Sequence, residues 1–184
     1  MADIASKHVA ILVDDYFEQV EFTKPKDALE QAGALTTIIT TSDSDTLHGM
    51  NHAKIGDKFM PDLHIEDVDF EDYDMLVIPG GVFNADNLRM NEIAREWVEY
   101  TIENDIPLGV ICHGPWLLVS ADVVDGLRLT SYYTLQDDIR NAGGDWVDKE
   151  LVIDGNVITS RKPDDLPAFC NALIETLNKT PVTH

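Results

Sequence analysis

Two uninterrupted apolar runs constrain the fold of this chain most strongly. Residues 75–78 are Met-Leu-Val-Ile and residues 108–111 are Leu-Gly-Val-Ile. A strand with one wet face alternates apolar and polar residues, whereas a strand buried on both faces is apolar throughout. The runs therefore indicate a sheet covered on both sides, and stretches with helical spacing separate them. The sequence predicts an α/β fold, a sandwich built on a mainly parallel sheet.

Apolar spacing and turn residues predict the remaining elements. We expect strands at 8–13, 35–41, 73–81 and 106–112, a hairpin within 150–160, and an irregular segment at 42–62 that holds a second small hairpin. Helical patterns fall within 14–34, 87–105, 114–124, 134–144 and 162–178. Pro25 should begin a new helical segment or kink the existing one, and Asp164 or Asp165 should cap the last helix.

Length and composition constrain the class of protein to which the chain can belong. It has 184 residues, 44% hydrophobic and 26% charged, which is ordinary for a globular protein, and we expect one domain over 1–184. Its N-terminal stretch lacks the apolar core of a signal peptide, and no apolar stretch is long enough to span a bilayer. The cysteines, Cys112 and Cys170, match no disulfide framework or metal pattern. We therefore expect a soluble protein of a reducing cytoplasm with no membrane partner.

The charge balance excludes one class of partner. Lys and Arg total 13 and Asp and Glu total 34, which gives a net charge of −21. Because binding to a phosphate backbone requires a basic face, we expect no nucleic-acid partner. The acidity has two explanations that the sequence leaves open. It provides a soluble acidic surface, or it is an adaptation to high salt, which screens the repulsion between like charges.

Cys112 stands where a buried strand is expected to become a helix. Gly114 and Pro115 suit a tight turn and a first helical position. A strand–nucleophile–helix turn exposes its side chain and directs the following N–H groups at it, although Val110 replaces the first glycine of the nucleophile-elbow pattern. The helix N-terminus should lower the pKa of the thiol. A buried, unreactive cysteine is the alternative, and it is what we expect of Cys170, which lies in an apolar helical pattern.

Loops after three predicted strands should meet Cys112. In a parallel sheet, ligands bind beyond the carboxyl ends of the strands, where the loops after residues 13, 79 and 111 converge. The first loop leads to Glu18 and Glu21, which share a face if helical; a carboxyl group there would tune the thiol, unless both side chains are simply solvated.

The other two loops bring backbone and imidazole groups. Gly80 and Gly81 suit either an oxyanion hole or a tight turn. His113, next to Cys112, is a candidate base or orienting group. The remaining histidine spacings match no metal site, so we predict none.

Five segments, in order, resemble the ThiJ/PfpI superfamily, specifically the branch of the intracellular protease PfpI, whose domain is of the type 1 glutamine amidotransferase kind. They are "DDYFEQVEFTKP", "YDMLVIPGG", "GVICHGPWLLVSA", "TSYYTLQDDIRNAGGDWVD" and "VIDGNVITSRKPDDLPAF", and they cover nearly the whole chain. The combination of "FEQVE", "PGG" and "ICHGP" carries the specificity. The resemblance implies a flavodoxin-like three-layer α/β/α sandwich with a nucleophile-elbow cysteine and no cofactor.

The resemblance also assigns roles to residues. A homo-oligomer, dimer or hexamer, is implied, because protease-like members complete a Cys-His-acid triad with an acid from a neighbouring subunit. The His-x-Glu pair of glutaminases is missing, since only His184 follows His113. The implied roles are Cys112 as nucleophile, His113 beside it, Glu21 hydrogen-bonded to the thiol, Asp86 as the acid from the neighbour, Gly80 and Gly81 as oxyanion donors, and Glu18 and Tyr132 lining the pocket.

Two classes of function remain in competition. The first is a cofactor-independent cysteine enzyme of stress response that acts on small carbonyl compounds or peptides, as a glyoxalase, a deglycase or a peptidase. All three chemistries begin with attack of a thiolate on a carbonyl carbon, so the sequence does not separate them, and we place small carbonyls first. The second is a redox sensor or stress chaperone that works through oxidation of Cys112. An unreactive thiol with no such role is the remaining possibility.

Overall fold

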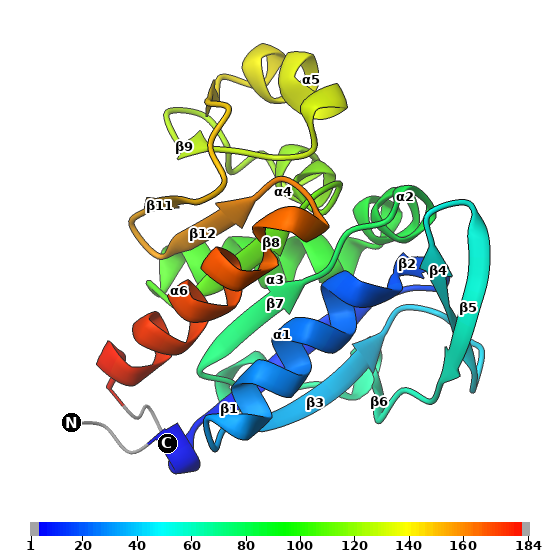
Figure 1. The fold of residues 1–184 in the computed structure, drawn as a ribbon. Helices are drawn as coiled ribbons and strands as arrows, with labels where there is room; N and C mark the ends of the chain where they lie inside the picture. The colour runs from blue at the N-terminus through cyan, green and yellow to red at the C-terminus, as the bar shows by residue number, and fades with distance from the viewer. Residues whose placement is uncertain (1–3, 182–184) are drawn as a thin grey trace.

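A seven-stranded sheet forms the centre of the protein (Figure 1). The structure is a computed structural model, and it describes residues 4–181. The strand order is β11-β12-β8-β7-β1-β3-β6, and all neighbours run parallel except the antiparallel pair β11–β12. Its strands are β1 (His8–Val13), β3 (Leu35–Thr40), β6 (Leu63–His64), β7 (Met75–Ile78), β8 (Leu108–Ile111), β11 (Val152–Asp154) and β12 (Val157–Ser160). The predicted mainly parallel sheet is confirmed.

Two small sheets lie outside the central one. Strand β2 pairs with β4, and β4 and β5 form the hairpin predicted within 42–62. The hairpin predicted within 150–160 is the β11–β12 pair. The outlying strands are β2 (Phe17–Glu18), β4 (Leu47–Asn51), β5 (Lys54–Phe59), β9 (Arg128–Leu129) and β10 (Asp145–Trp146).

Helices cover both faces of the central sheet. They are α1 (Gln19–Gln31), α2 (Val82–Met90), α3 (Glu92–Glu103), α4 (Pro115–Ser120), α5 (Gln136–Asn141) and α6 (Leu166–Lys179), with short 3-10 turns at Ile4–Ser6, Ile65–Asp67, Phe70–Asp72, Tyr133–Leu135 and Pro163–Asp165. In Figure 1, α1 and α6 lie together on the near side of the sheet, and α3 lies behind it. This is the flavodoxin-like three-layer α/β/α sandwich that the sequence predicts.

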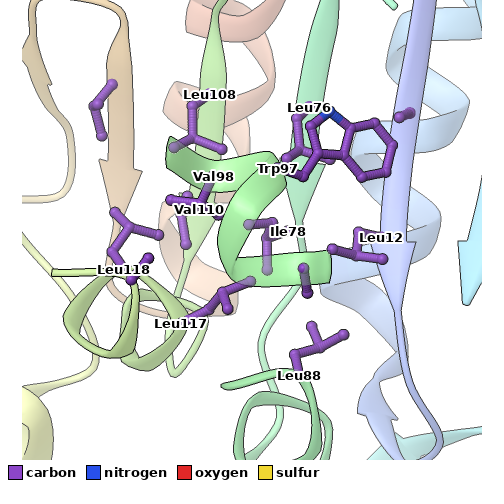
Figure 2. Packing of buried hydrophobic residues seen from close by; sticks show 14 of the residues in the cluster. Leu12, Leu76, Ile78, Leu88, Trp97, Val98, Leu108, Val110, Leu117 and Leu118 are labelled. Atoms are coloured by element: carbon purple, nitrogen blue, oxygen red, sulfur yellow. The ribbon is translucent and has the colours of Figure 1, made fainter. Parts of the chain in front are cut away.

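Alternating side chains of the buried strands supply both cores. In β1, Val9 and Ile11 pack in the cluster that contains Phe22 of α1 and Phe169 of α6. Leu12 points the other way, into the cluster around Trp97 of α3 (Figure 2). Because successive residues of a strand face opposite sides of a sheet, an apolar run such as β1 can bury side chains in two layers at once.

Two helix boundaries differ from the predicted ones, because local polar geometry ends each helix. The single helix expected over 87–105 is two helices, α2 and α3. Asn91 between them is extended, and its side-chain oxygen accepts the N–H of Ala94, 2.9 Å away, as the N-cap of α3. The helix expected over 114–124 ends at Ser120, since Asp122 takes the left-handed conformation (φ 57°) that closes a helix.

The structure also bears on two expectations about proline and capping. Pro25 begins no new segment, because it lies buried inside the continuous helix α1, and the alternative of a kink at Pro25 stays a prediction. Asp165 occupies the N-cap position of α6 but makes no side-chain cap, because its carboxylate accepts from the backbone N–H and the guanidinium of Arg161.

Candidate active site

Cys112 sits in a strained turn between β8 and α4. Its φ of 62° lies in the left-handed region, which L-residues with a side chain rarely adopt and which recurs at functional sites. Hydrogen bonds fix the turn on both sides: the N–H of Cys112 donates to the carbonyl of Ser160 (3.1 Å), and its carbonyl accepts the N–H of Tyr132 (2.8 Å). The predicted strand–cysteine–helix turn is therefore present.

Backbone N–H groups surround the sulfur. The N–H groups of Gly81 and His113 both face Sγ and lower the pKa of the thiol. The N–H of Gly80 faces the carboxyl group of Glu21 instead. Of the predicted glycine pair, Gly81 thus addresses the sulfur and Gly80 addresses the acid beside it.

Glycine is required at both positions of this pair. A Cβ on Gly80 would overlap Oε1 of Glu21 and would lie 2.6 Å from Cβ of Cys112. Gly81 has a φ of 96°, and a Cβ there would lie 2.6 Å from the backbone nitrogen of Glu18. Only a residue without a side chain allows the thiol, the acid and the β7–α2 loop to approach this closely.

Glu21 is a buried acid that holds its proton at neutral pH. Burial raises its pKa to about 8, and the charge of Glu18 adds to the rise, while the Cys112 thiol and the Gly80 N–H oppose it. Within residues 4–181, neither carboxyl oxygen has a partner at ordinary hydrogen-bond geometry. A protonated Glu21 therefore carries a donor next to Sγ that no other acceptor takes.

The prediction that the pKa of the Cys112 thiol is lowered is wrong. Burial raises the pKa of Cys112 well above that of a free thiol, and the charge of Glu21 acts in the same direction. The N–H groups of Gly81 and His113 oppose this rise without reversing it. Desolvation outweighs the effect of the helix N-terminus on this pKa, because the Cys112 residue is only 7% exposed.

His113 lies beside the thiol of Cys112. Its Nδ1 lies 3.2 Å from Sγ of Cys112. Burial lowers the pKa of His113 to about 4, so the ring is neutral at pH 7 and, with its proton on Nε2, accepts at Nδ1. The ring also stacks on Tyr132, with centroids 4.8 Å apart, which holds its orientation.

A cavity of about 870 Å³ opens onto the sulfur. The loops after β1, β7 and β8 meet at its floor, as predicted, and bring Glu18, Gly81, Cys112 and His113 together. Tyr132 lines the wall. The sequence did not single out the rest of the lining, which is Tyr16, Met50, His52, Ala53, Val82, Phe83, Tyr133, Thr134, Lys162, Pro163 and Asp164.

Three of the missed lining residues, Met50, His52 and Ala53, come from the β4–β5 hairpin. Gln19 at the start of α1 anchors this hairpin: its amide donates to the carboxylate of Asp57 (2.7 Å) and accepts the N–H of Asp57 (2.8 Å). The N–H of His52 donates to the carboxylate of Glu18. The hairpin was predicted, but no sequence signal shows that it folds over the site.

Two residues lie apart from the site. Asp86 is exposed on α2 and does not line the cavity, so its predicted part in a triad across subunits stays a prediction. Cys170 is buried in α6 among the apolar residues that pack against the sheet, and burial raises its pKa to about 11. This agrees with the expectation that Cys170 has a packing role.

Comparison with known proteins identifies the family. The model of the DJ-1/PfpI family matches residues 7–176. The chain belongs to the DJ-1/PfpI family. Among curated relatives of this family member, protein SH1084 of Staphylococcus haemolyticus is 41% identical over 174 residues, which cover 94% of this chain and 98% of the relative. YraA of Bacillus subtilis, which carries a provisional name as a cysteine protease, is 41% identical over 164 residues, which cover 89% of this chain and 94% of YraA.

Solved structures of the DJ-1/PfpI family agree with the fold. A protein of Anabaena variabilis with DJ-1/ThiJ/PfpI-like and ferritin-like domains superposes with a TM-score of 0.88 at 31% identity, over 96% of this chain and half of that two-domain chain. DJ-1beta of Drosophila melanogaster superposes with a TM-score of 0.86 at 25% identity, over 94% of this chain and 90% of DJ-1beta. In residues 4–181, no helix combines the length and apolarity that crossing a membrane requires.

Proposed function

We propose that this DJ-1/PfpI protein is a cofactor-independent cysteine enzyme that acts on carbonyl compounds, with Cys112 as the nucleophile. The observation that carries the proposal is the convergence on one sulfur of two backbone N–H groups, a protonated carboxyl group and a neutral imidazole. A cysteine kept for packing needs none of these groups, as Cys170 illustrates.

Different neighbouring groups accept the thiol proton and stabilise the oxyanion during the attack. His113 Nδ1 takes the proton of the Cys112 thiol while the sulfur forms a bond to the carbonyl carbon. The carbonyl oxygen gains the electron pair of the broken π bond and becomes an oxyanion next to Sγ. The Gly81 N–H and the protonated Glu21 are the donors near that position, and Glu21 donates a hydrogen bond to the oxyanion and keeps its proton throughout the step.

We place a small aldehyde above a peptide as the substrate. The cavity opens to solvent through walls built largely from aromatic and apolar side chains, and it is large enough for a compact substrate. We place methylglyoxal first: attack at its aldehyde carbon, an internal proton shift and addition of one water release lactate and restore the thiol. Glyoxal-derived adducts and peptides are the alternatives, and YraA supports the peptide alternative by its name alone.

Turnover of methylglyoxal tests the proposal. Purified protein is incubated with methylglyoxal, and loss of the aldehyde and appearance of lactate are followed. Cys112→Ala should abolish lactate formation, because no other described group near the cavity floor is a comparable nucleophile. Cys170→Ala is the matched control and should retain the wild-type rate. Lactate formation that survives Cys112→Ala would refute the proposal.

A second candidate function uses the same donors on an oxidised sulfur. The Gly81 and His113 N–H groups and the protonated Glu21 would also stabilise the oxygens of a sulfinate. In that reaction two peroxide molecules each transfer one oxygen to the thiolate and leave as water. A peroxide-dependent gain of two oxygen atoms on Cys112, together with no turnover of carbonyl substrates, would favour the sensor function.

Assembly is part of the first proposal. In the described chain His113 has no carboxylate partner among the cavity-lining contacts, and Asp86 lies exposed on α2, where a second copy can present it. We propose a homo-oligomer, dimer or hexamer, in which Asp86 of a neighbour completes the triad. Asp86→Asn should then lower turnover only in preparations that sediment as the oligomer.

A further inference from the structure

A fully buried amide, Asn84, lies behind the glycine pair and outside the cavity. It belongs to the first turn of α2 and is 0% exposed. Its side-chain nitrogen donates to the carbonyls of Pro79 and Gly80, both 3.0 Å away. Its side-chain oxygen accepts the N–H of Asp14, 2.7 Å away, from the loop after β1. One side chain thus ties two of the three loops that converge on the sulfur.

The carbonyl of Gly80 is held from two directions. Besides the Asn84 amide, the N–H of Glu18 donates to it over 3.1 Å. This carbonyl and the N–H of Gly81 are the two ends of one planar peptide group, and no described peptide bond is cis. In a trans peptide the C=O and the N–H point in opposite directions, so fixing the oxygen also fixes the direction of the N–H.

We infer that Asn84 is a positioning residue that aims the Gly81 N–H at Sγ of Cys112 by holding the Gly80 carbonyl. The rotation it prevents is the one that glycine would otherwise allow, because Gly80 and Gly81 have no side chains to restrict them. The inference deepens the proposed function, since it rests on the use of this N–H as a donor in the reaction. The effect on the thiol exists whether or not a carbonyl substrate is turned over.

The chemistry of the pocket around this side chain requires an amide. Two carbonyls and one N–H face it, so it must offer two N–H donors and one acceptor, which Asn supplies and Asp does not. An apolar replacement would remove this hydrogen-bond partner from three buried backbone groups, and the Gly80 carbonyl would keep only the N–H of Glu18.

Charged neighbours do not account for the effect. The titratable groups that interact with Cys112 are Glu21, His113 and Tyr132, and Asn84 forms no hydrogen bond with the side chain of any of them. The carboxylate of Asp14 is occupied by other donors, Thr41, Asn87 and the N–H of Asp15. Replacing Asn84 by Ala therefore changes the direction of a peptide group and adds no charge.

Alkylation of the thiol by iodoacetamide across pH tests the inference. Asn84→Ala should raise the pH midpoint for Cys112 labelling and reduce its rate at neutral pH about tenfold, since the thiolate loses a charge-assisted hydrogen bond. Asn87→Ala is the matched control: it removes from the same helix an amide that donates to the carboxylate of Asp14, and it leaves the hydrogen bonds of the Gly80 carbonyl in place. It should keep the wild-type midpoint.

A folded Asn84→Ala variant with the wild-type rate and midpoint would overturn the inference. If that variant does not fold, wild-type protein decides by NMR. The Gly81 amide proton should titrate with the same midpoint as Cys112 labelling, and the side-chain amide protons of Asn84 should exchange slowly with solvent. The inference would be overturned if the chemical shift of the Gly81 amide proton did not change as Cys112 titrates, or if the Asn84 side-chain protons exchanged rapidly with solvent. Alkylation needs no substrate, so failure of methylglyoxal turnover removes the proposed function without deciding this point.

Discussion

At the scale of single residues, the pairing of a thiol with a buried acid defines the site. Gly80 allows the two groups to meet, because any side chain there would overlap both. Glu21 then loses its solvation, and the resulting rise of its pKa to about 8 keeps it protonated at neutral pH. The protein thus carries an acid that ionises unfavourably when folded, which lowers stability in order to keep a proton beside the sulfur.

A Glu21→Gln variant should show how much the buried Glu21 lowers the stability of the fold. Above the ordinary pKa of 4.5 the unfolded chain releases the Glu21 proton while the folded chain keeps it until about pH 8. The folded state binds more protons in this window, so its free energy of unfolding falls as pH rises from 4.5 to 8. Glu21→Gln removes the titration and should stabilise the protein by about 3 kcal/mol at pH 7.

Urea denaturation at pH 4.5, 6, 7 and 8 measures this difference. The gain from Glu21→Gln should be near its minimum at the lowest pH and should grow towards pH 8. Glu18→Gln is the control, because it removes the neighbouring charge and keeps the titrating group. A Glu21→Gln variant whose gain does not change with pH would show that Glu21 is ionised in the native protein.

Residue identities were predictable from the sequence to the extent that motifs encode them. Cys112, His113 and Glu21 were selected, and the structure brings them together. The direction of the thiol pKa was not predictable, because burial depends on packing from segments distant in sequence. Asn84 was missed for a similar reason: its role lies in three hydrogen bonds to backbone groups of two loops, which no spacing rule reveals.

At the scale of elements, the β7–α2 connection orients the backbone N–H of Gly81 towards the sulfur of Cys112. Gly81 is the N-cap of α2 and adopts a conformation open only to glycine. The backbone of Glu18 passes so close to it that the loop and the start of α1 form one packed unit. Backbone contact therefore helps to hold the elements that position the nucleophile, and the Asn84 side chain adds hydrogen bonds between two of their loops.

Gly81→Ala should lower the free energy of unfolding by more than the strained backbone conformation alone would. The strained φ contributes about 1–3 kcal/mol, and the contact with the Glu18 backbone adds to it because neither chain can move aside. Gly126→Ala provides the comparison, since Gly126 also has a positive φ of 75° but nothing lies within 4 Å of its would-be Cβ. The melting temperature of Gly81→Ala should be lower than that of Gly126→Ala. Equal melting temperatures would contradict the close approach of the Glu18 backbone to Gly81.

Element types were predictable, and several boundaries were not. Apolar runs identified β1, β7 and β8, because strands buried on two faces leave a continuous pattern in sequence. The break at Asn91 was missed because apolar spacing continues on both sides of it, while the cap is a single polar contact. The short helix α4 ends for a comparable local reason, the left-handed Asp122.

At the scale of the whole molecule, a net charge of −21 is spread over 184 residues. Repulsion among these acids opposes compaction, and salt reduces it over a screening length of about 10 Å at 0.1 M. If the acidity is an adaptation to high salt, the melting temperature should rise from low to molar salt. Thermal scans in increasing NaCl measure this, and a melting temperature that stays constant would remove that explanation.

The family and the layered fold followed from the sequence, whereas assembly did not. The order of strands and helices, with the segments that resemble ThiJ/PfpI proteins, was sufficient for both conclusions, and the family match over residues 7–176 agrees. The single-domain organisation over 1–184 and the homo-oligomer stay predictions. Oligomers form through exposed surfaces, and their contacts leave no periodic pattern comparable to that of a buried strand.

Protection of Cys112 by substrate tests the central claim most directly. The wild-type protein is labelled with iodoacetamide at neutral pH, with and without methylglyoxal, and labelling at Cys112 and Cys170 is quantified by mass spectrometry. The account predicts faster labelling at Cys112, because a cavity opens onto it, and slower labelling of Cys112 alone when methylglyoxal occupies the sulfur. Labelling of Cys112 that is no faster than that of Cys170, or that methylglyoxal leaves unchanged, would contradict the assignment of Cys112 as a nucleophile for carbonyl compounds.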